Sequence, residues 1–280
     1  QGEGVNLSLE DKIRVAHRLD EFGIDFIEGG WPGSNPKDVD FFVRMQSEHL
    51  KHAKVTSFGS TRHAKNTPDS DPNLQKLVEA KTPVVTIFGK TWDLHVTAAL
   101  KVDLNVNLDM IRDSVAFLKK NIPMVIYDAE HFFDGYKSNP EYALSTIQAA
   151  VEGGADRVVL CDTNGGSLLD QVAELTRKVK EVCSVPVGIH CHNDSGLATA
   201  NTIAAVTNGA THVQGTINGY GERCGNVDLC VAIPNIVLKL GFEAAHPDQI
   251  SNLTDLSRYV AELANLPYRN NQPFVGMSAF

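Results

Sequence analysis

The sequence has few cysteines, and their spacing does not suggest disulfide bonds that would cross-link the fold. Its 280 residues include five cysteines, at positions 161, 183, 191, 224 and 230, and no two of them form a Cys-x-x-Cys pair. An odd number without paired spacing argues against a disulfide framework and against a structural zinc site. We therefore expect a cytoplasmic protein whose thiols stay reduced.

The sequence also lacks long apolar stretches, a secretory leader and an excess of positive charge. No run is apolar over the roughly 18 residues that a membrane helix needs. The net charge is −9 and the pI is about 5.5, so the clustered positive field that binds nucleic acid or anionic membranes is not expected. No Gly-x-Gly-x-x-Gly phrase follows the early strand-like segments, which argues against dinucleotide binding. Small molecules are the expected partners.

Apolar strand-like segments alternate with helical patterns along the chain. We expect strands near 24–28, 53–58, 83–88, 123–128, 157–161, 185–190 and 212–216. Helical patterns lie near 8–22, 36–51, 72–80, 107–120, 140–152, 167–182, 195–208 and 226–240. Continuously apolar strands between helices predict a parallel sheet covered by helices.

This order predicts an α/β fold of the (β/α)8 TIM-barrel type, with strand one upstream of Gln1. An open, doubly wound sheet is the alternative, because it tolerates seven strands. Residues 1–240 would form the catalytic barrel, holding strands two to eight. Residues 241–280 are less regular and are interpreted as a connector to a further segment.

The phrase His190-Cys191-His192-Asn193-Asp194 follows directly on an apolar run. Side chains two apart on a strand share a face, so His190 and His192 should point the same way and Cys191 the other way. Two imidazoles at a strand end make half of a metal site. The alternative is a pair of core histidines that bind backbone carbonyls.

Polar side chains follow the other strands as well. In a barrel of this type, chemistry gathers at the carboxyl ends of the strands. The ring of candidates comprises Glu28, Arg62, Lys90, Asp93, His95, Asp128, Glu130, Asp162, Thr163, Asn164, His190 and His192. Any one of them could be an ordinary solvated loop residue, but the whole ring is harder to explain in that way.

A glycine-rich segment, residues 218–226, follows the last strand. Its three glycines allow a tight fold around a ligand, and Glu222, Arg223 and Asn226 supply an acceptor, a cation and a neutral oxygen. The plainer interpretation is a turn before the helix at 226–240, with Asn226 as its N-cap.

Five phrases together resemble a known enzyme family. They are residues 27–34 (IEGGWPGS), 128–135 (DAEHFFDG), 161–166 (CDTNGG), 190–194 (HCHND) and 221–226 (GERCGN). In order and spacing they are similar to the 2-isopropylmalate synthase/homocitrate synthase/citramalate synthase family of metal-dependent, Claisen-condensing TIM barrels, which is related to hydroxymethylglutaryl-CoA lyase. The likeness covers nearly the whole chain and is greatest to the citramalate synthase branch.

The resemblance implies a role for each member of the site. His190 and His192 would be metal ligands, with Asn226 a third or neighbouring ligand. Glu130 and Glu222 would be catalytic residues, and the substrate contacts would be Thr163, His95 and Glu28. The family also carries an Arg and an Asp in a Leu-Arg-Asp-Gly phrase, which the resemblance places upstream of Gln1.

The implied activity is that of an acyltransferase of amino-acid biosynthesis, on the isoleucine/leucine route. It would condense acetyl-CoA with a 2-oxo acid, pyruvate giving citramalate, with the help of Mg²⁺, Mn²⁺ or Zn²⁺. Open alternatives are a 2-isopropylmalate or homocitrate synthase, a lyase that runs carbon–carbon chemistry in reverse, and a non-catalytic fragment if the upstream strand is absent. The resemblance also implies a homodimer.

Overall fold

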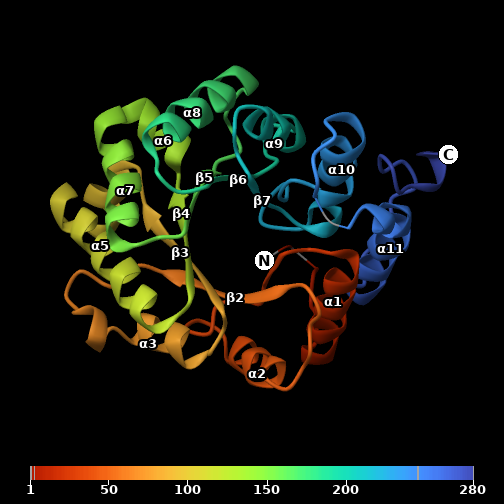
Figure 1. The fold of residues 1–280 in the computed structure, drawn as a ribbon, viewed down its shortest axis with the longest axis horizontal. Coiled ribbons are helices and arrows are strands. Elements are labelled where there is room, and N and C mark those ends of the chain that lie inside the picture. The colour runs from red at the N-terminus through yellow and green to blue at the C-terminus, as the bar shows by residue number, and fades with distance from the viewer. Residues whose placement is uncertain (1, 3, 245, 280) are drawn as a thin grey trace.

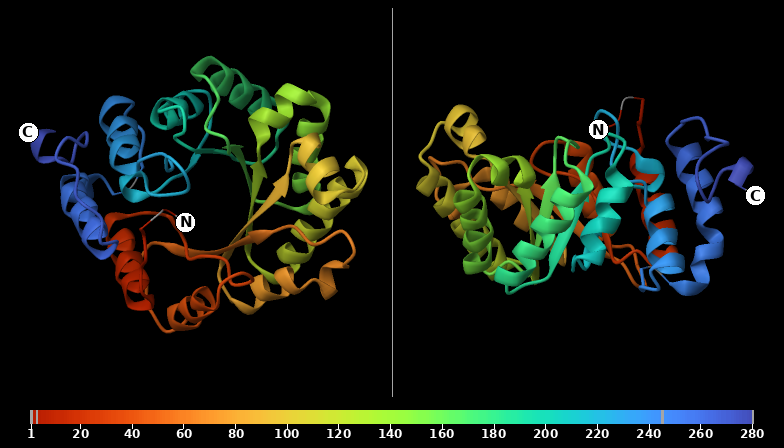
Figure 2. Two further views of the ribbon diagram at one scale, coloured as in Figure 1. Left: turned by 180° about the vertical axis from the view of Figure 1, so that it is seen from behind. Right: turned by 90° about the horizontal axis from the view of Figure 1, so that it is seen from above.

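The computed structural model describes residues 2, 4–244 and 246–279. Seven parallel strands pair in sequence order, from β1 to β7, into one sheet. The sheet curls around a central space with the helices outside it (Figures 1 and 2). The strands are β1 (Phe26–Glu28), β2 (Lys54–Ser60), β3 (Val84–Lys90), β4 (Met124–Glu130), β5 (Arg157–Asp162), β6 (Val187–Cys191) and β7 (His212–Gln214). The predicted α/β class of TIM-barrel type is confirmed, with these seven strands in the described part.

The helices cover the outer face of the sheet. They are α1 (Leu9–Phe22), α2 (Pro36–Met45), α3 (Pro72–Glu79), α4 (Asp93–His95), α5 (Leu104–Asn121), α6 (Phe132–Ser138), α7 (Pro140–Gly153), α8 (Leu169–Val182), α9 (Ala198–Thr207), α10 (Leu229–Pro234) and α11 (Leu253–Leu263). Within the described ranges, no helix is both long enough and apolar enough to cross a bilayer.

The first helix begins and ends where its sequence predicts. The Ser8 hydroxyl accepts a hydrogen bond from the Asp11 amide (3.2 Å), and the Asp11 carboxylate accepts one from the Ser8 amide (3.0 Å). This capping box satisfies amides that the helix itself leaves free. Gly23 ends the helix with a φ of 93°, a left-handed conformation that favours glycine.

The last predicted helix differs from the expectation. Asn226 is not its N-cap: Asp228 caps α10 and accepts a hydrogen bond from the Cys230 amide (2.9 Å). The helical pattern is also interrupted, because α10 ends at Pro234 and a π-helical turn, Asn235–Lys239, follows. The side chain of Asn226 is therefore not used in a cap.

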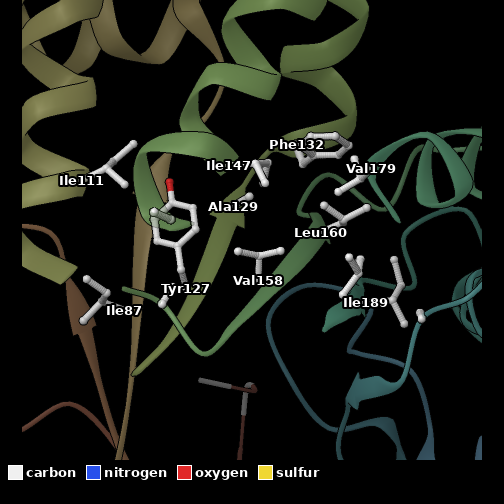
Figure 3. Close-up of a cluster of buried hydrophobic side chains, with 14 of the residues drawn as sticks. Ile87, Ile111, Tyr127, Ala129, Phe132, Ile147, Val158, Leu160, Val179 and Ile189 are labelled. Carbon is white, nitrogen blue, oxygen red and sulfur yellow. The ribbon is translucent and has the colours of Figure 1, made fainter. Parts of the chain in front are cut away.

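The main core lies between the strands and the helices. Figure 3 shows Ile87, Tyr127, Leu160 and Ile189, which come from neighbouring strands, facing a layer of helix side chains that includes Ile147. All five are at most 3% exposed. Burial of each such aliphatic or aromatic side chain contributes roughly 1.5–3 kcal/mol. This core fixes the strands in register, and the register in turn places the residues at their carboxyl ends.

Residues after 240 pack against the start of the chain. Helix α11 lies beside α1 (Figures 1 and 2). Its residues Leu256 and Val260 share a buried cluster with Phe22 and Ile217. Part of this less regular region is helical, as α11. The division into a barrel at 1–240 and a connector at 241–280 stays a prediction.

Candidate metal centre and active site

Strand β6 brings His190 and His192 together as predicted. Their ring centroids are 5.1 Å apart. Cys191, between them, is fully buried in the core that the strands share with the helices. The two imidazoles therefore lie on one side of the strand end and the thiol on the other.

The glycine-rich segment folds back beside the two histidines. Its backbone runs antiparallel to β6, with the Val227 amide donating to the Cys191 carbonyl (2.9 Å) and the Asn193 amide donating to the Gly225 carbonyl (2.9 Å). This pairing sets Asn226 directly opposite His192. The three predicted metal ligands are therefore neighbours, although Asn226 lies 34 or more residues further along the chain.

The side-chain oxygen of Asn226 has no hydrogen-bond partner although it is buried. The amide nitrogen of the same side chain donates to the Tyr220 carbonyl (3.1 Å), which fixes the amide's orientation. A Cβ on Gly221 would lie 2.0 Å from that nitrogen, so this position requires glycine. A buried carbonyl oxygen without a donor is costly, and a bound cation would satisfy it.

Gln214, at the end of β7, determines which nitrogen of His190 is protonated. Its amide nitrogen donates to Asp128 (2.9 Å), so its amide oxygen faces Nδ1 of His190 (2.9 Å). Because that oxygen can only accept, Nδ1 carries the proton and Nε2 keeps a free lone pair. A metal-ligating histidine needs this arrangement. Burial also lowers the pKa of His190, which favours the neutral ring.

Replacing Gln214 with leucine is expected to lower the affinity for divalent cations by about 10- to 100-fold, the usual cost of losing a group that orients a ligand. Calorimetric titration of the full-length protein with Mn²⁺ measures this. Gln148→Leu, at an exposed position on α7, is the control and should leave the affinity unchanged. Equal affinities for wild type and Gln214→Leu would contradict the assigned role.

His192 is held differently from His190. Nη2 of Arg223 lies 2.6 Å from its Nδ1, and the same guanidinium binds both carboxylate oxygens of Asp194 (2.8 and 3.0 Å). Nη2 also donates to the Thr163 carbonyl (2.6 Å). Burial, together with the neighbouring His190 and the positive charge of Arg223, lowers the pKa of His192 to about 4. The ring is therefore neutral at physiological pH.

Glu130 lies at the end of β4, paired with Lys90 on the adjacent strand. The two residues are in register, and Lys90 Nζ lies 2.5 Å from a Glu130 carboxylate oxygen. Both side chains are only partly exposed, at 24% for Lys90 and 21% for Glu130. An ion pair of this kind holds the carboxylate in one place.

Glu28 ends β1 on the same side of the sheet. Desolvation by the surrounding strands raises the pKa of the Glu28 carboxyl to about 7, although solvent still reaches much of the side chain. Burial and the charge of Glu28 raise the pKa of Asp128 well above its ordinary value. Charges on this inner face are therefore coupled across the sheet.

Glu28→Gln is expected to stabilise the protein at pH 8 and leave its stability unchanged at pH 4. A carboxyl whose pKa rises from 4.5 to about 7 on folding gives stability that is full below pH 4.5 and is lost as the pH rises through 7. Because solvent screens the exposed part of the side chain, the gain should be only about 1 kcal/mol. Urea unfolding at both pH values measures it. Glu10→Gln, at an exposed position, is the control. An equal gain in stability at both pH values for Glu28→Gln would contradict the raised pKa of Glu28.

The remaining predicted residues are arranged around this centre. The Thr163 hydroxyl accepts a hydrogen bond from the His131 amide (2.8 Å). The His95 ring lies 4.4 Å from that of His131, and burial lowers the pKa of His95. Glu222 is half exposed, 3.7 Å from Arg223. Arg223 thus connects Thr163 to the candidate metal ligands. His95 instead pairs with His131, which lies next to Thr163.

A polar network that the sequence analysis missed ties the end of the chain to the glycine-rich segment. The Gln272 amide donates to Asp228 (2.8 Å) and to Asn218 (3.1 Å), and the Ser257 hydroxyl donates to Asn218 (2.6 Å). Gln272, Ser257 and Asn218 are each at most 5% exposed. The segment that carries Asn226 is therefore anchored from both sides.

The donor set fits a divalent cation. Across residues 2, 4–244 and 246–279, no three His, Cys, Asp or Glu side chains converge as a ready metal cluster. The centre instead offers His190 with a free lone pair, the unpartnered Asn226 oxygen, and His192, whose one lone pair faces Arg223. Two imidazoles and an amide oxygen suit Mg²⁺, Mn²⁺ or Zn²⁺ with positions left for substrate.

The sequence matches a known protein family over most of its length. The family model described as HMGL-like matches residues 1–260. An (R)-citramalate synthase of Aquifex aeolicus is 57% identical over the whole chain, and a 2-isopropylmalate synthase of Sulfolobus acidocaldarius is 34% identical. The chain spans 53% of the former and 69% of the latter, so it covers about half the length of the citramalate synthase.

Solved structures give the same fold. An HMG-CoA lyase of Bacillus subtilis superposes with a TM-score of 0.78 at 17% identity, over 95% of this chain and 90% of the lyase. Identity at that level supports the fold alone. The family model covers far more than half of the sequence, and the chain therefore belongs to the HMGL-like family.

Proposed function

We propose that the protein condenses acetyl-CoA with pyruvate to give citramalate and free CoA. The observation that carries this proposal is the identity of 57% with a citramalate synthase over the whole chain, against 34% with a 2-isopropylmalate synthase. Both relatives are named as synthases, so the higher identity to the citramalate synthase favours pyruvate, the smaller 2-oxo acid. Residues 1–240 would hold the catalytic centre.

His190, His192 and Asn226 would hold the divalent cation. Bound there, such a cation supplies Lewis-acid polarisation of a 2-oxo acid carbonyl. Gln214 keeps His190 in the tautomer that can ligate. Thr163 directly after β5, His95 on α4 and Glu28 at the end of β1 would contact the 2-oxo acid.

Glu130 is our candidate for the base that removes a proton from the methyl group of the acetyl thioester. The ammonium of Lys90 holds the Glu130 carboxylate in one orientation. The carbon that loses the proton forms the new bond to the keto carbon of pyruvate, and hydrolysis of the thioester then releases CoA. Glu222, on the glycine-rich segment, would supply a second catalytic carboxylate. A base of this kind typically accounts for about 10²- to 10⁴-fold in rate.

A thiol-release assay on the full-length protein tests the proposal. Acetyl-CoA is offered with pyruvate, 2-oxoisovalerate or 2-oxoglutarate, and free CoA is followed with a thiol reagent. Pyruvate should give the highest kcat/KM. Preference for a larger 2-oxo acid would favour an isopropylmalate or homocitrate synthase, and cleavage of a hydroxyacyl-CoA without condensation would favour a lyase.

We also propose a cytoplasmic homodimer. The five cysteines are all free, which fits a reducing compartment. Light scattering on the full-length protein would give its mass, and a monomer at micromolar concentration would contradict the dimer.

A further inference from the structure

We infer that Arg223 competes with the divalent cation for His192, so that His192 becomes a ligand of the cation only when the contact between Arg223 and His192 opens. Arg223 thus acts as a positioning residue for the metal centre. The inference rests on the proposed metal site and extends it to a residue whose role the proposed reaction does not require.

The competition follows from the hydrogen-bonding capacity of the two side chains. A neutral imidazole has one protonated nitrogen and one lone pair, whereas a guanidinium has only donors. At 2.6 Å from Nη2 of Arg223, Nδ1 of His192 must accept, so Nε2 carries the proton. His192 then has no lone pair left for a cation at either nitrogen.

His190 and His192 are thus prepared in opposite ways. Gln214 accepts from Nδ1 of His190 and leaves its Nε2 free, whereas Arg223 donates to Nδ1 of His192. A cation could be captured first by His190 and the Asn226 oxygen. His192 would join only after its proton has moved to Nδ1, which requires the guanidinium to withdraw, since two N–H groups cannot face each other at 2.6 Å.

Arg223 can withdraw without losing its other partners. Nη2 has two hydrogens but three acceptors within 3.0 Å: His192, Asp194 and the Thr163 carbonyl. If it gives up His192, both hydrogens still have an acceptor. The side chain is 43% exposed, and the Arg223 backbone has a φ of 53°, a left-handed conformation that is unfavourable for arginine.

Charge acts in the same direction as the hydrogen bond. The guanidinium lies beside the ring that would hold a divalent cation, so it repels the cation as well as occupying the lone pair. Asp194 partly offsets this charge because it binds Arg223 through both oxygens. Removal of Arg223 should therefore increase the affinity for the cation.

Calorimetric titration with Mn²⁺ tests this in the full-length protein. Arg223→Met should bind Mn²⁺ at least about 10-fold more tightly than wild type, the usual effect of one charge-assisted hydrogen bond. Arg112→Met is the matched control and should leave the affinity unchanged, since Arg112 on α5 forms ion pairs with Asp109 and with Glu152 of α7. Unchanged or weaker binding by Arg223→Met would overturn the inference.

A second measurement remains decisive if Arg223→Met fails to fold. ¹⁵N NMR of the imidazole nitrogens should show His192 protonated at Nε2 after EDTA treatment and at Nδ1 after addition of Zn²⁺. Protonation at Nδ1 under both conditions would overturn the inference. Failure of the metal site itself would give a different result, because wild type would then bind no Mn²⁺ at all. If binding is lost in His192→Ala but unaltered in Arg223→Met, only the role assigned to Arg223 is contradicted.

Discussion

His192→Ala is expected to abolish turnover and to lower the affinity for divalent cations by at least about 100-fold. Loss of a group that merely orients a ligand costs 10- to 100-fold, so loss of a ligand itself should cost at least the upper end of that range. His190 and Asn226 would remain as donors, but one imidazole and one amide hold a cation weakly. Mn²⁺ titration and the thiol-release assay measure the two effects in the same preparation.

His49→Ala is the control for this substitution. His49 is exposed, so its loss should change neither binding nor rate. Circular dichroism would show whether His192→Ala still folds, which is expected because alanine leaves the backbone pairing of this strand end unaltered. Full activity in a folded His192→Ala protein would refute the ligand assignment.

Glu130→Gln is expected to lower kcat by about 10²- to 10⁴-fold with little change in KM for the 2-oxo acid. Glutamine keeps the shape of the side chain but cannot accept a proton. It also removes the charge that Lys90 faces at 2.5 Å, so some of the loss could come from disorder of Lys90.

Lys90→Met separates these two contributions. If the carboxylate of Glu130 acts as the base, Lys90→Met should lose less activity than Glu130→Gln, because the base remains. Glu141→Gln, at an exposed position of α7, controls for the loss of a negative charge. A larger loss in Lys90→Met than in Glu130→Gln would assign the essential role to the ammonium group.

Most of the fold could be predicted because the strands are continuously apolar and the helices carry local signals. The capping box at Ser8 and the left-handed Gly23 define α1 from nearby residues alone. The start of α10 could not be placed in this way. Asn226 and Asp228 are both good N-caps, and the choice between them is made by the pairing of the segment with β6, a tertiary contact.

The candidate site was predictable in part. Residues two apart on a strand share a face, so the His190–His192 pair follows from the sequence. The role of Gln214 does not, because glutamine at a strand end has no motif and its amide is oriented by Asp128 on a distant strand. Because Gln214 on β7 is in register with His190 on β6, the same reasoning would have predicted that the two side chains are neighbours on one face of the sheet.

The network around Gln272 has a consequence for anyone who shortens this protein. Cutting after residue 240 would look harmless, because every strand would survive. It would nevertheless remove the donors to Asn218 and Asp228, two residues that flank the loop bearing Asn226. The trimmed barrel would keep both imidazoles but hold its amide oxygen on an unsupported loop.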